Sequence, residues 1–263
     1  MTGSVTFRNN INRFGKGAQT IMFAHGYGCD QNMWRFITPA FEKDFDIILF
    51  DHIGSGKSDI SAYDFSKYNS LKGYAEDVIT ICEDLNLKNV IFVGHSVSSM
   101  IGVLSAVKRA DLFSRLIMIC PSPRYIKDEN YEGFSKQDID GMLEMLENNY
   151  LGWSSSITPV IAGNDQAASD ELKNSFCRMN PKIAKHFAKV TFLGDHREDL
   201  AKVSTPTLII QCDPDGIAPV QVGKYVHSQM QNSQFSHFNV PGHSPHLTAP
   251  GQTTKAISSY LNL

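Results

Sequence analysis

The stretch FVGHSVSSM, residues 92–100, has the sequence of a strand that turns sharply into a helix at a serine. An apolar run ends at Gly94, Ser96 follows, and residues 97–107 have helical spacing. This is the setting of a nucleophile elbow, whose usual pattern is G-x-S-x-G. Ser98 stands at the place of the second glycine. Because the requirement there is a small side chain, we predict that Ser96 is still a nucleophile.

Short apolar runs bounded by turn residues alternate with helical patterns along the chain. Continuous apolarity over four to six residues predicts strands buried on both faces, as in a parallel sheet. The predicted strands are residues 20–24, 46–50, 90–94, 115–120, 207–212 and 235–240. The clearest predicted helices are residues 71–85, 97–107, 220–229 and 252–261. The alternation predicts an α/β fold with a mainly parallel sheet.

Residues 122–203 interrupt this alternation, because no convincing strand occurs among them. Apolar residues at helical spacing predict helices there instead. One face combines Ile139, Met142, Leu143, Leu146 and Tyr150, and a later one combines Ile183, Ala184, Phe187 and Val190. We interpret residues 122–203 as an inserted helical cap, with a separate small domain as the alternative. The core is then expected in two parts, residues 1–121 and 204–263.

A glycine-containing loop after the first predicted strand offers an oxyanion hole. FAHGYGCDQNMW, residues 23–34, contains a His-Gly turn that lets the backbone N–H of Tyr27 point at a substrate oxygen. The N–H of Val97, directly after the serine, is the second expected donor. A glycine-rich turn without a catalytic role is the alternative.

Two later loops offer an acid and a histidine. QCDPDGIAP, residues 211–219, contains Asp213 and Asp215, and VPGHSPHL, residues 240–247, contains His243 and His246. An imidazole can take and return the serine proton, and a buried carboxylate fixes its tautomer. The chain order serine, aspartate, histidine is that of α/β-hydrolases. We predict Asp215, nearer the loop tip, and His243, aimed by Gly242, with Asp213 and His246 as alternatives.

The composition is that of a globular protein, with 42% hydrophobic residues, 19% charged residues and a formal charge of −3. No basic run marks a nucleic-acid surface, so we expect no nucleic-acid partner. No apolar stretch is long enough to span a membrane, and the first residues lack the pattern of a secretory leader. The expected location is therefore cytoplasmic, without a membrane partner.

Three other features carry weaker signals. The five cysteines are scattered without a C-x-x-C pair, which predicts mostly buried core thiols rather than disulfides or zinc. GSGKSD, residues 54–59, resembles the end of a phosphate loop, but position 51 is an aspartate instead of the required glycine. DHRED, residues 195–199, and His186 lack the spacing of metal ligands. We therefore expect neither a metal nor a cofactor.

Several segments together resemble one α/β-hydrolase subfamily, which contains the bacterial sigma-B stress regulator RsbQ and the plant karrikin and strigolactone receptors. They are GHSVSSMIGVL, HGYGCDQNMW, DHIGSGKSD, PSPRY and GHSPHLTAP. Serine at the second elbow glycine is usual in the plant branch. CDQ, NNYLGW and DHREDL look more similar to the bacterial branch, so the chain is expected to lie closer to RsbQ.

The resemblance implies a hydrolase core, a V-shaped cap of four helices and a deep apolar pocket above the serine. By position it implies the triad Ser96, Asp215 and His243 and the oxyanion donors Tyr27 and Val97. It also implies pocket-lining roles, although each of these residues could be plain cap core: Phe134, Trp153, Ile157 and Phe192. Ile157 stands where plant members tend to carry phenylalanine, which bears on the ligand preference.

The resemblance further implies signalling, because RsbQ works with a PAS-containing phosphatase and the plant receptors perceive butenolides. The expected function is a slow serine hydrolase that acts on or senses a small hydrophobic ester or lactone in a signalling or stress pathway. The alternative is a metabolic carboxylesterase without a signalling partner. Both functions need the same triad.

Overall fold

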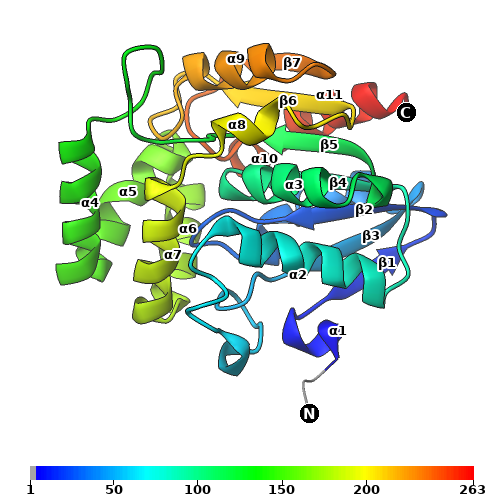
Figure 1. Ribbon diagram of the computed structural model, residues 1–263, viewed down its shortest axis with the longest axis horizontal. Helices are drawn as coiled ribbons and strands as arrows, with labels where there is room; N and C mark the ends of the chain where they lie inside the picture. The colour runs from blue at the N-terminus through cyan, green and yellow to red at the C-terminus, as the bar shows by residue number, and fades with distance from the viewer. Residues whose placement is uncertain (1–3) are drawn as a thin grey trace.

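The computed structural model describes residues 4–263, and seven strands of that part of the chain form one sheet (Figure 1). The sheet order is β1-β3-β2-β4-β5-β6-β7, in which only β1 runs antiparallel to its neighbour. The strands are β1 (Asn12–Gly15), β2 (Gln19–Ala24), β3 (Phe45–Phe50), β4 (Val90–His95), β5 (Phe113–Ile119), β6 (Thr207–Cys212) and β7 (Ser233–Phe238). The predicted α/β fold with a mainly parallel sheet is confirmed.

Helices cover both faces of the sheet, which explains the unbroken apolar strands. One face packs against α2 (Leu71–Asp84), α3 (Val97–Lys108) and α9 (Val220–Gln229). The other face packs against α11 (Pro250–Leu261) and the segment around Trp34. Alternate residues of β4 serve the two faces, since Phe92 belongs to the first cluster and Ile91 and Val93 to the second.

All six predicted strands are present, with ends that differ by up to two residues. The sequence did not indicate β1, because this edge strand has mostly exposed side chains and lacks the apolar run of a buried strand. Short α1 (Val5–Arg8) and α10 (Pro245–Thr248) were also not predicted, whereas α8 (Arg197–Leu200) lies in the segment where helices were expected.

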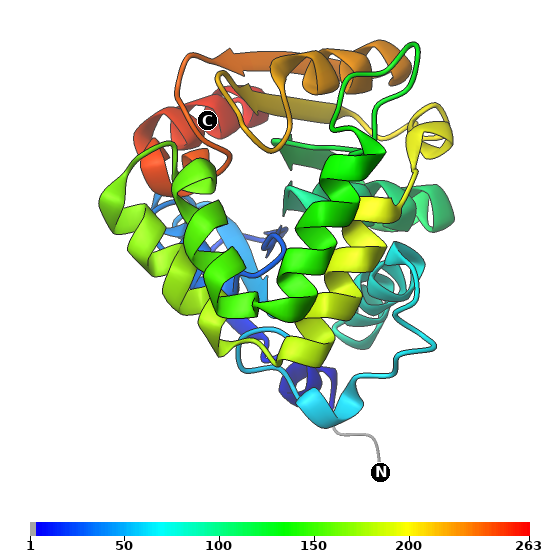
Figure 2. The same ribbon diagram turned by 90° about the vertical axis from the view of Figure 1, so that its left-hand side faces the viewer.

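Four helices fill most of the segment between β5 and β6. They are α4 (Lys136–Asn148), α5 (Tyr150–Ala162), α6 (Gln166–Arg178) and α7 (Pro181–Leu193). They lie together at the end of the sheet where the parallel strands terminate (Figures 1 and 2). The predicted division into residues 1–121, 122–203 and 204–263 stays a prediction, although no strand of the described sheet interrupts the helical segment.

One helix predicted in residues 122–203 ends earlier in the structure than expected. The apolar face from Ile139 was extended to Tyr150, but α4 ends at Asn148 and Asn149 caps a new helix. The Asn149 side chain accepts a hydrogen bond from the backbone N–H of Gly152 at 3.0 Å. Asparagine is a favoured N-cap, so this residue stops one helix and starts the next.

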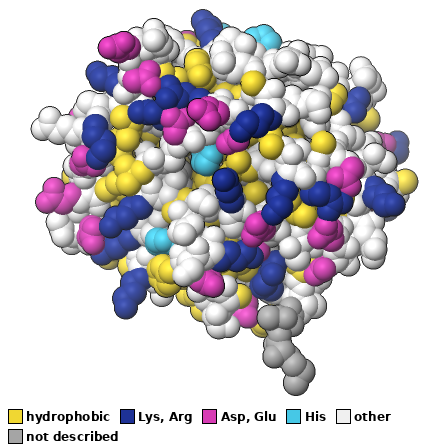
Figure 3. Space-filling view, viewed as in Figure 1, with side chains coloured by type: hydrophobic (Ala, Val, Ile, Leu, Met, Phe, Trp, Pro, Cys, Tyr) yellow, Lys and Arg dark blue, Asp and Glu magenta, His cyan; other side chains and the backbone are white. Residues whose placement is uncertain are grey.

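The surface mixes charges of both signs. On the face shown in Figure 3, acidic and basic side chains are interspersed with hydrophobic ones. None of the helices in residues 4–263 is long and apolar enough to cross a bilayer.

Candidate active site

Ser96 lies at the sharp junction between β4 and α3, as the sequence predicted. Its backbone has φ 56° and ψ −121°, a conformation that costs a non-glycine residue roughly 1–3 kcal/mol. Its N–H donates to the carbonyl oxygen of Ile119 at 2.8 Å, which ties the turn to β5. A Cβ on Gly94 would lie 2.5 Å from the Ser98 carbonyl oxygen, so only glycine fits at position 94.

Ser96, His243 and Asp215 form one hydrogen-bonded chain. The Oγ of Ser96 lies 2.8 Å from Nε2 of His243, and Nδ1 of His243 lies 2.7 Å from Oδ2 of Asp215. The serine comes from the β4–α3 turn, the aspartate from the loop after β6 and the histidine from the loop after β7. All three are buried.

Further donors hold the Asp215 carboxylate. Oδ1 accepts hydrogen bonds from the backbone N–H groups of Ile217 at 2.8 Å and Ala218 at 3.0 Å. Oδ2 also accepts from Nε2 of Gln211 at 3.2 Å. A buried carboxylate needs such partners to offset its loss of water, so the loop stabilises an oriented acid.

The structure does not bring the two alternative residues to Ser96. The Asp213 side chain is 45% exposed and faces His237 at 3.4 Å. His246 is buried with its ring 4.6 Å from that of Trp34 and 4.4 Å from that of His95. Burial, and then the neighbouring His243, lower the pKa of His246 to about 3. Neither residue is placed to relay a proton from the serine.

The loop that carries His243 is fixed partly by the end of α5. Gly242 has φ 99°, so its conformation favours glycine, as expected from its position before the histidine. The N–H of His243 donates to the Ile161 carbonyl oxygen at 2.8 Å, and that of Gly242 donates to Pro214 at 2.9 Å. The orientation of His243 therefore depends on α5.

The two expected oxyanion donors lie beside the serine. A Cβ on Gly26 would lie 2.6 Å from Nδ1 of His95 and 3.4 Å from Cβ of Ser96, so the His-Gly turn packs directly against the elbow. Val97 opens α3, where a first-turn N–H lacks an intrahelical partner. Within residues 4–263, neither the N–H of Tyr27 nor that of Val97 donates to another group. Both N–H groups are therefore available to donate to a ligand.

A cavity of about 310 Å³ opens onto Ser96 and His243. Apolar side chains from the cap make most of its wall, and the Tyr27 ring lies among the rings of Trp153, Phe176, Phe187 and Phe192 with centroids 5.5–6.1 Å away. The Tyr27 hydroxyl donates to the Ala184 carbonyl oxygen of α7 at 2.9 Å.

All four residues expected to line a pocket lie in the wall of this cavity: Phe134, Trp153, Ile157 and Phe192. The sequence reasoning missed further lining residues, among them Tyr125, Phe176 and Cys29. PSPRY, which contains Tyr125, contributed to the resemblance but gave no signal for a role in the site. Burial raises the pKa of the Cys29 thiol far above its ordinary value, so the thiol stays protonated.

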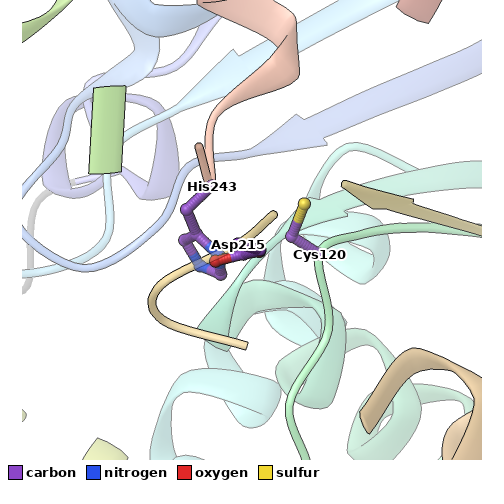
Figure 4. A group of neighbouring side chains, drawn as sticks. All are labelled: Cys120, Asp215 and His243. Atoms are coloured by element: carbon purple, nitrogen blue, oxygen red, sulfur yellow. The ribbon is translucent and has the colours of Figure 1, made fainter. Parts of the chain in front are cut away.

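Cys120 completes a cluster with two residues of the hydrogen-bonded chain (Figure 4). Its Sγ and one atom each of Asp215 and His243 all lie within 4.8 Å of one another. The aspartate and histidine atoms already bond each other, and burial raises the pKa of the Cys120 thiol. We interpret the cluster as part of the serine site rather than as a set of metal ligands.

The weaker sequence signals have structural roles. Asp51, which spoils the phosphate-loop pattern, accepts the backbone N–H groups of Lys57 at 2.9 Å and Gln31 at 2.8 Å in a turn after β3. His186 lies 2.8 Å from the Tyr63 hydroxyl, and Asp195 pairs with Arg124 and Arg197. The five cysteines are free thiols, and only Cys177 is exposed.

Comparisons with known proteins agree with this fold. A family model described as alpha/beta hydrolase fold matches residues 19–250. The chain therefore belongs to the α/β-hydrolase family.

Among its relatives, the Karrikin insensitive 2 receptor CA of Petunia hybrida is 37% identical over 252 residues, covering 94% of this chain and 93% of the receptor. Strigolactone esterase D14 of Arabidopsis thaliana is 34% identical over 251 residues, covering 94% of each chain. The structure of olei00960, a hydrolase from Oleispira antarctica, superposes with a TM-score of 0.95 at 40% identity, covering 98% of this chain and 96% of that one.

These relatives correct one expectation. The chain was expected to lie closer to the bacterial regulator RsbQ, but the two curated relatives above are plant proteins. The expectation rested on the short segments CDQ, NNYLGW and DHREDL, whereas the likeness to the plant proteins extends over about 250 residues. Short shared segments carry less weight than identity along the whole chain.

Proposed function

We propose that this protein is a serine hydrolase that binds and slowly cleaves a small hydrophobic ester or lactone and acts as a signalling regulator. The observation that carries the proposal is the chain Ser96–His243–Asp215 at the base of a cavity enclosed by the cap. The proposed nucleophile is Ser96, the proposed base is His243, and Asp215 holds the imidazole.

In the proposed acylation, Oγ of Ser96 attacks the substrate carbonyl carbon while its proton passes to Nε2 of His243. The developing oxyanion accepts hydrogen bonds from the N–H groups of Tyr27 and Val97. Collapse of the tetrahedral intermediate breaks the bond to the leaving oxygen, which takes the proton from Nε2. An acyl-serine remains. A water molecule then attacks the acyl carbon while its proton passes to Nε2 of His243. The bond between the acyl carbon and Oγ of Ser96 breaks, Oγ takes the proton from Nε2, and the acid product leaves.

The cavity favours a small apolar substrate. Its volume of about 310 Å³ lies at the lower end of the roughly 300–1,000 Å³ of small-molecule sites. Aromatic and aliphatic side chains, which make up most of the lining, supply binding by burial. Phe134, Trp153, Ile157 and Phe192 are proposed to contact the acyl or lactone ring.

The signalling part of the proposal rests on the relatives and on the cap. Two relatives at 37% and 34% identity carry the names of a karrikin receptor and a strigolactone esterase. The enclosing helices of this chain present an outer surface that a partner can read if it prefers one liganded state, because a ligand shifts such an equilibrium only through differential affinity. The subfamily that the sequence motifs resemble contains RsbQ as well as the plant receptors, and on that ground we propose a PAS-containing phosphatase as the partner, in a stress pathway and in the cytoplasm.

Ester turnover and partner capture together test this function. We expect measurable but slow hydrolysis of p-nitrophenyl acetate and butyrate by the wild type, and none above background by Ser96→Ala. In a pulldown from the native lysate, we expect one specific partner whose recovery changes when a hydrophobic lactone is added. Rapid turnover without a specific partner would instead support the metabolic carboxylesterase.

A further inference from the structure

Ser98, at the place where the usual elbow has glycine, makes polar contacts that its small size alone does not require. Its side chain is fully buried. Oγ donates to the carbonyl oxygen of His25 at 2.5 Å and lies 2.7 Å from Nε2 of His52. Because the single hydroxyl proton is used toward His25, Nε2 of His52 must be the donor in the second bond.

The two histidines close a ring of hydrogen bonds around Ser98. The backbone N–H of His52 donates to Nε2 of His25 at 3.1 Å. Nε2 of His25 is therefore an acceptor, and its Nδ1 carries the proton. All three side chains are 1% exposed or less. Burial, and then His25, lower the pKa of His52, which keeps this imidazole neutral.

This ring of hydrogen bonds also restrains the Gly26–Tyr27 peptide, which bears the expected oxyanion donor. Nδ1 of His25 lies 2.8 Å from the carbonyl oxygen of Gly26. In a trans peptide the carbonyl and the following N–H point in opposite directions. A bond that fixes the Gly26 carbonyl toward His25 therefore turns the N–H of Tyr27 away from it, toward the cavity that Tyr27 shares with Ser96.

We propose that the Ser98 hydroxyl is a positioning residue for the oxyanion hole: through His25 it locks the elbow and the Gly26–Tyr27 peptide into one rigid unit. This inference rests on the proposed function, since it assumes that the N–H of Tyr27 binds the oxyanion. The hydroxyl does not touch the reacting atoms. It removes freedom from a donor whose alignment matters only when negative charge develops.

The test compares Ser98→Ala and Ser98→Gly with the wild type. Neither variant adds bulk at position 98, and Ser98→Gly restores the usual elbow glycine, so at least one of them should fold. The measured quantities are kcat and KM for p-nitrophenyl butyrate and the affinity of an aryl trifluoromethyl ketone, which forms an oxyanion on the serine. Loss of one aligned donor lowers kcat by about 10²–10³. For a donor that is loosened rather than removed, we expect about a tenfold loss in kcat and in ketone affinity, with KM changed less than about twofold.

Ser105→Ala is the matched control. Ser105 lies on the same helix and is fully buried. Its Oγ donates to the carbonyl oxygen of Ile101 at 2.8 Å and lies 3.3 Å from that of Ala75. We expect this variant to lose thermal stability without losing kcat or ketone affinity.

A folded Ser98→Ala with wild-type kcat and ketone affinity overturns the inference, as do equal losses of kcat in Ser98→Ala and Ser105→Ala. Failure of the wild type itself to react with the ketone contradicts the proposed function instead. The two failures are therefore distinguishable.

Discussion

Oδ2 of Asp215 lies 2.7 Å from Nδ1 of His243, whereas the carboxylate of Asp213, two residues earlier, faces His237 at the surface. An asparagine at position 215 can no longer hold the imidazole in the required tautomer or stabilise its charged form. We expect Asp215→Asn to lower kcat by about 10⁴ for a generic ester while the thermal unfolding stays cooperative. Asp213→Asn is the control and should keep at least half of the wild-type kcat. A greater loss of kcat in Asp213→Asn than in Asp215→Asn would show that Asp215 is not the acid.

Ile157 lies in the cavity wall on α5 and is proposed to set the size of the ligand. Ile157→Phe adds volume to a cavity of about 310 Å³. We expect KM to rise severalfold for p-nitrophenyl hexanoate and to change little for the acetate, because only the longer acyl chain needs the lost space. Leu151→Phe, on the exposed side of the same helix, is the control for a general effect on α5. Equal responses of the two esters would show that position 157 does not limit the ligand.

We expect His246 to make the protein less stable in acid. In the unfolded chain a histidine has a pKa of about 6.5, whereas burial lowers the pKa of His246 in the folded protein to about 3. Between these values the unfolded state binds the extra proton, so the free energy of unfolding falls as pH drops from about 6.5 toward 3. Burial also lowers the pKa of His52 and His95, which adds to the same loss.

Replacing His246 by phenylalanine should reduce the loss of stability in acid. Neither ring nitrogen of His246 has a hydrogen-bond partner within residues 4–263, so the apolar ring sacrifices no bond there. Urea unfolding at pH 7.5 and pH 5 measures the effect. Over this interval we expect the free energy of unfolding to fall by about 2 kcal/mol more in the wild type than in His246→Phe. An identical fall in the free energy of unfolding in both proteins would show that His246 does not contribute to the acid sensitivity.

Gly94 and Gly141 differ in the space around them. A Cβ at Gly94 would lie 2.5 Å from the Ser98 carbonyl oxygen, while one at Gly141 on α4 would meet nothing within 4 Å. Gly94→Ala must therefore displace backbone at the elbow, and we expect it to lower the melting temperature and ester turnover together. Gly141→Ala should stabilise the protein by roughly 0.5–1 kcal/mol through helix propensity. If both variants melt like the wild type, the crowding at Gly94 is not rigid.

Much of the sheet was predictable because its strands are buried on both faces and read as apolar runs. The pattern of Ile91, Phe92 and Val93 is one example. The edge strand β1 was not predictable, since an exposed strand has no such pattern. The break at Asn149 was missed because its cap interrupts an apolar periodicity that otherwise runs on.

For the candidate site, chain order and turn chemistry led to Ser96, Asp215 and His243, which the structure brings together. The polar contacts of Ser98 were not predictable, because they join residues 25, 52 and 98, which are distant in the sequence. From the sequence alone, position 98 carries only a steric requirement. The same limit applies to Tyr125 and Phe176, whose places in the cavity depend on how the cap packs.

The most direct test of the account is intact-protein mass spectrometry after treatment with a fluorophosphonate. An activated serine at a strained elbow should form one covalent adduct, and a peptide map should place it on Ser96. We expect one adduct on the wild type and none on Ser96→Ala. No adduct on the folded wild type, or an adduct that persists in Ser96→Ala, would contradict the assignment of Ser96 as the nucleophile.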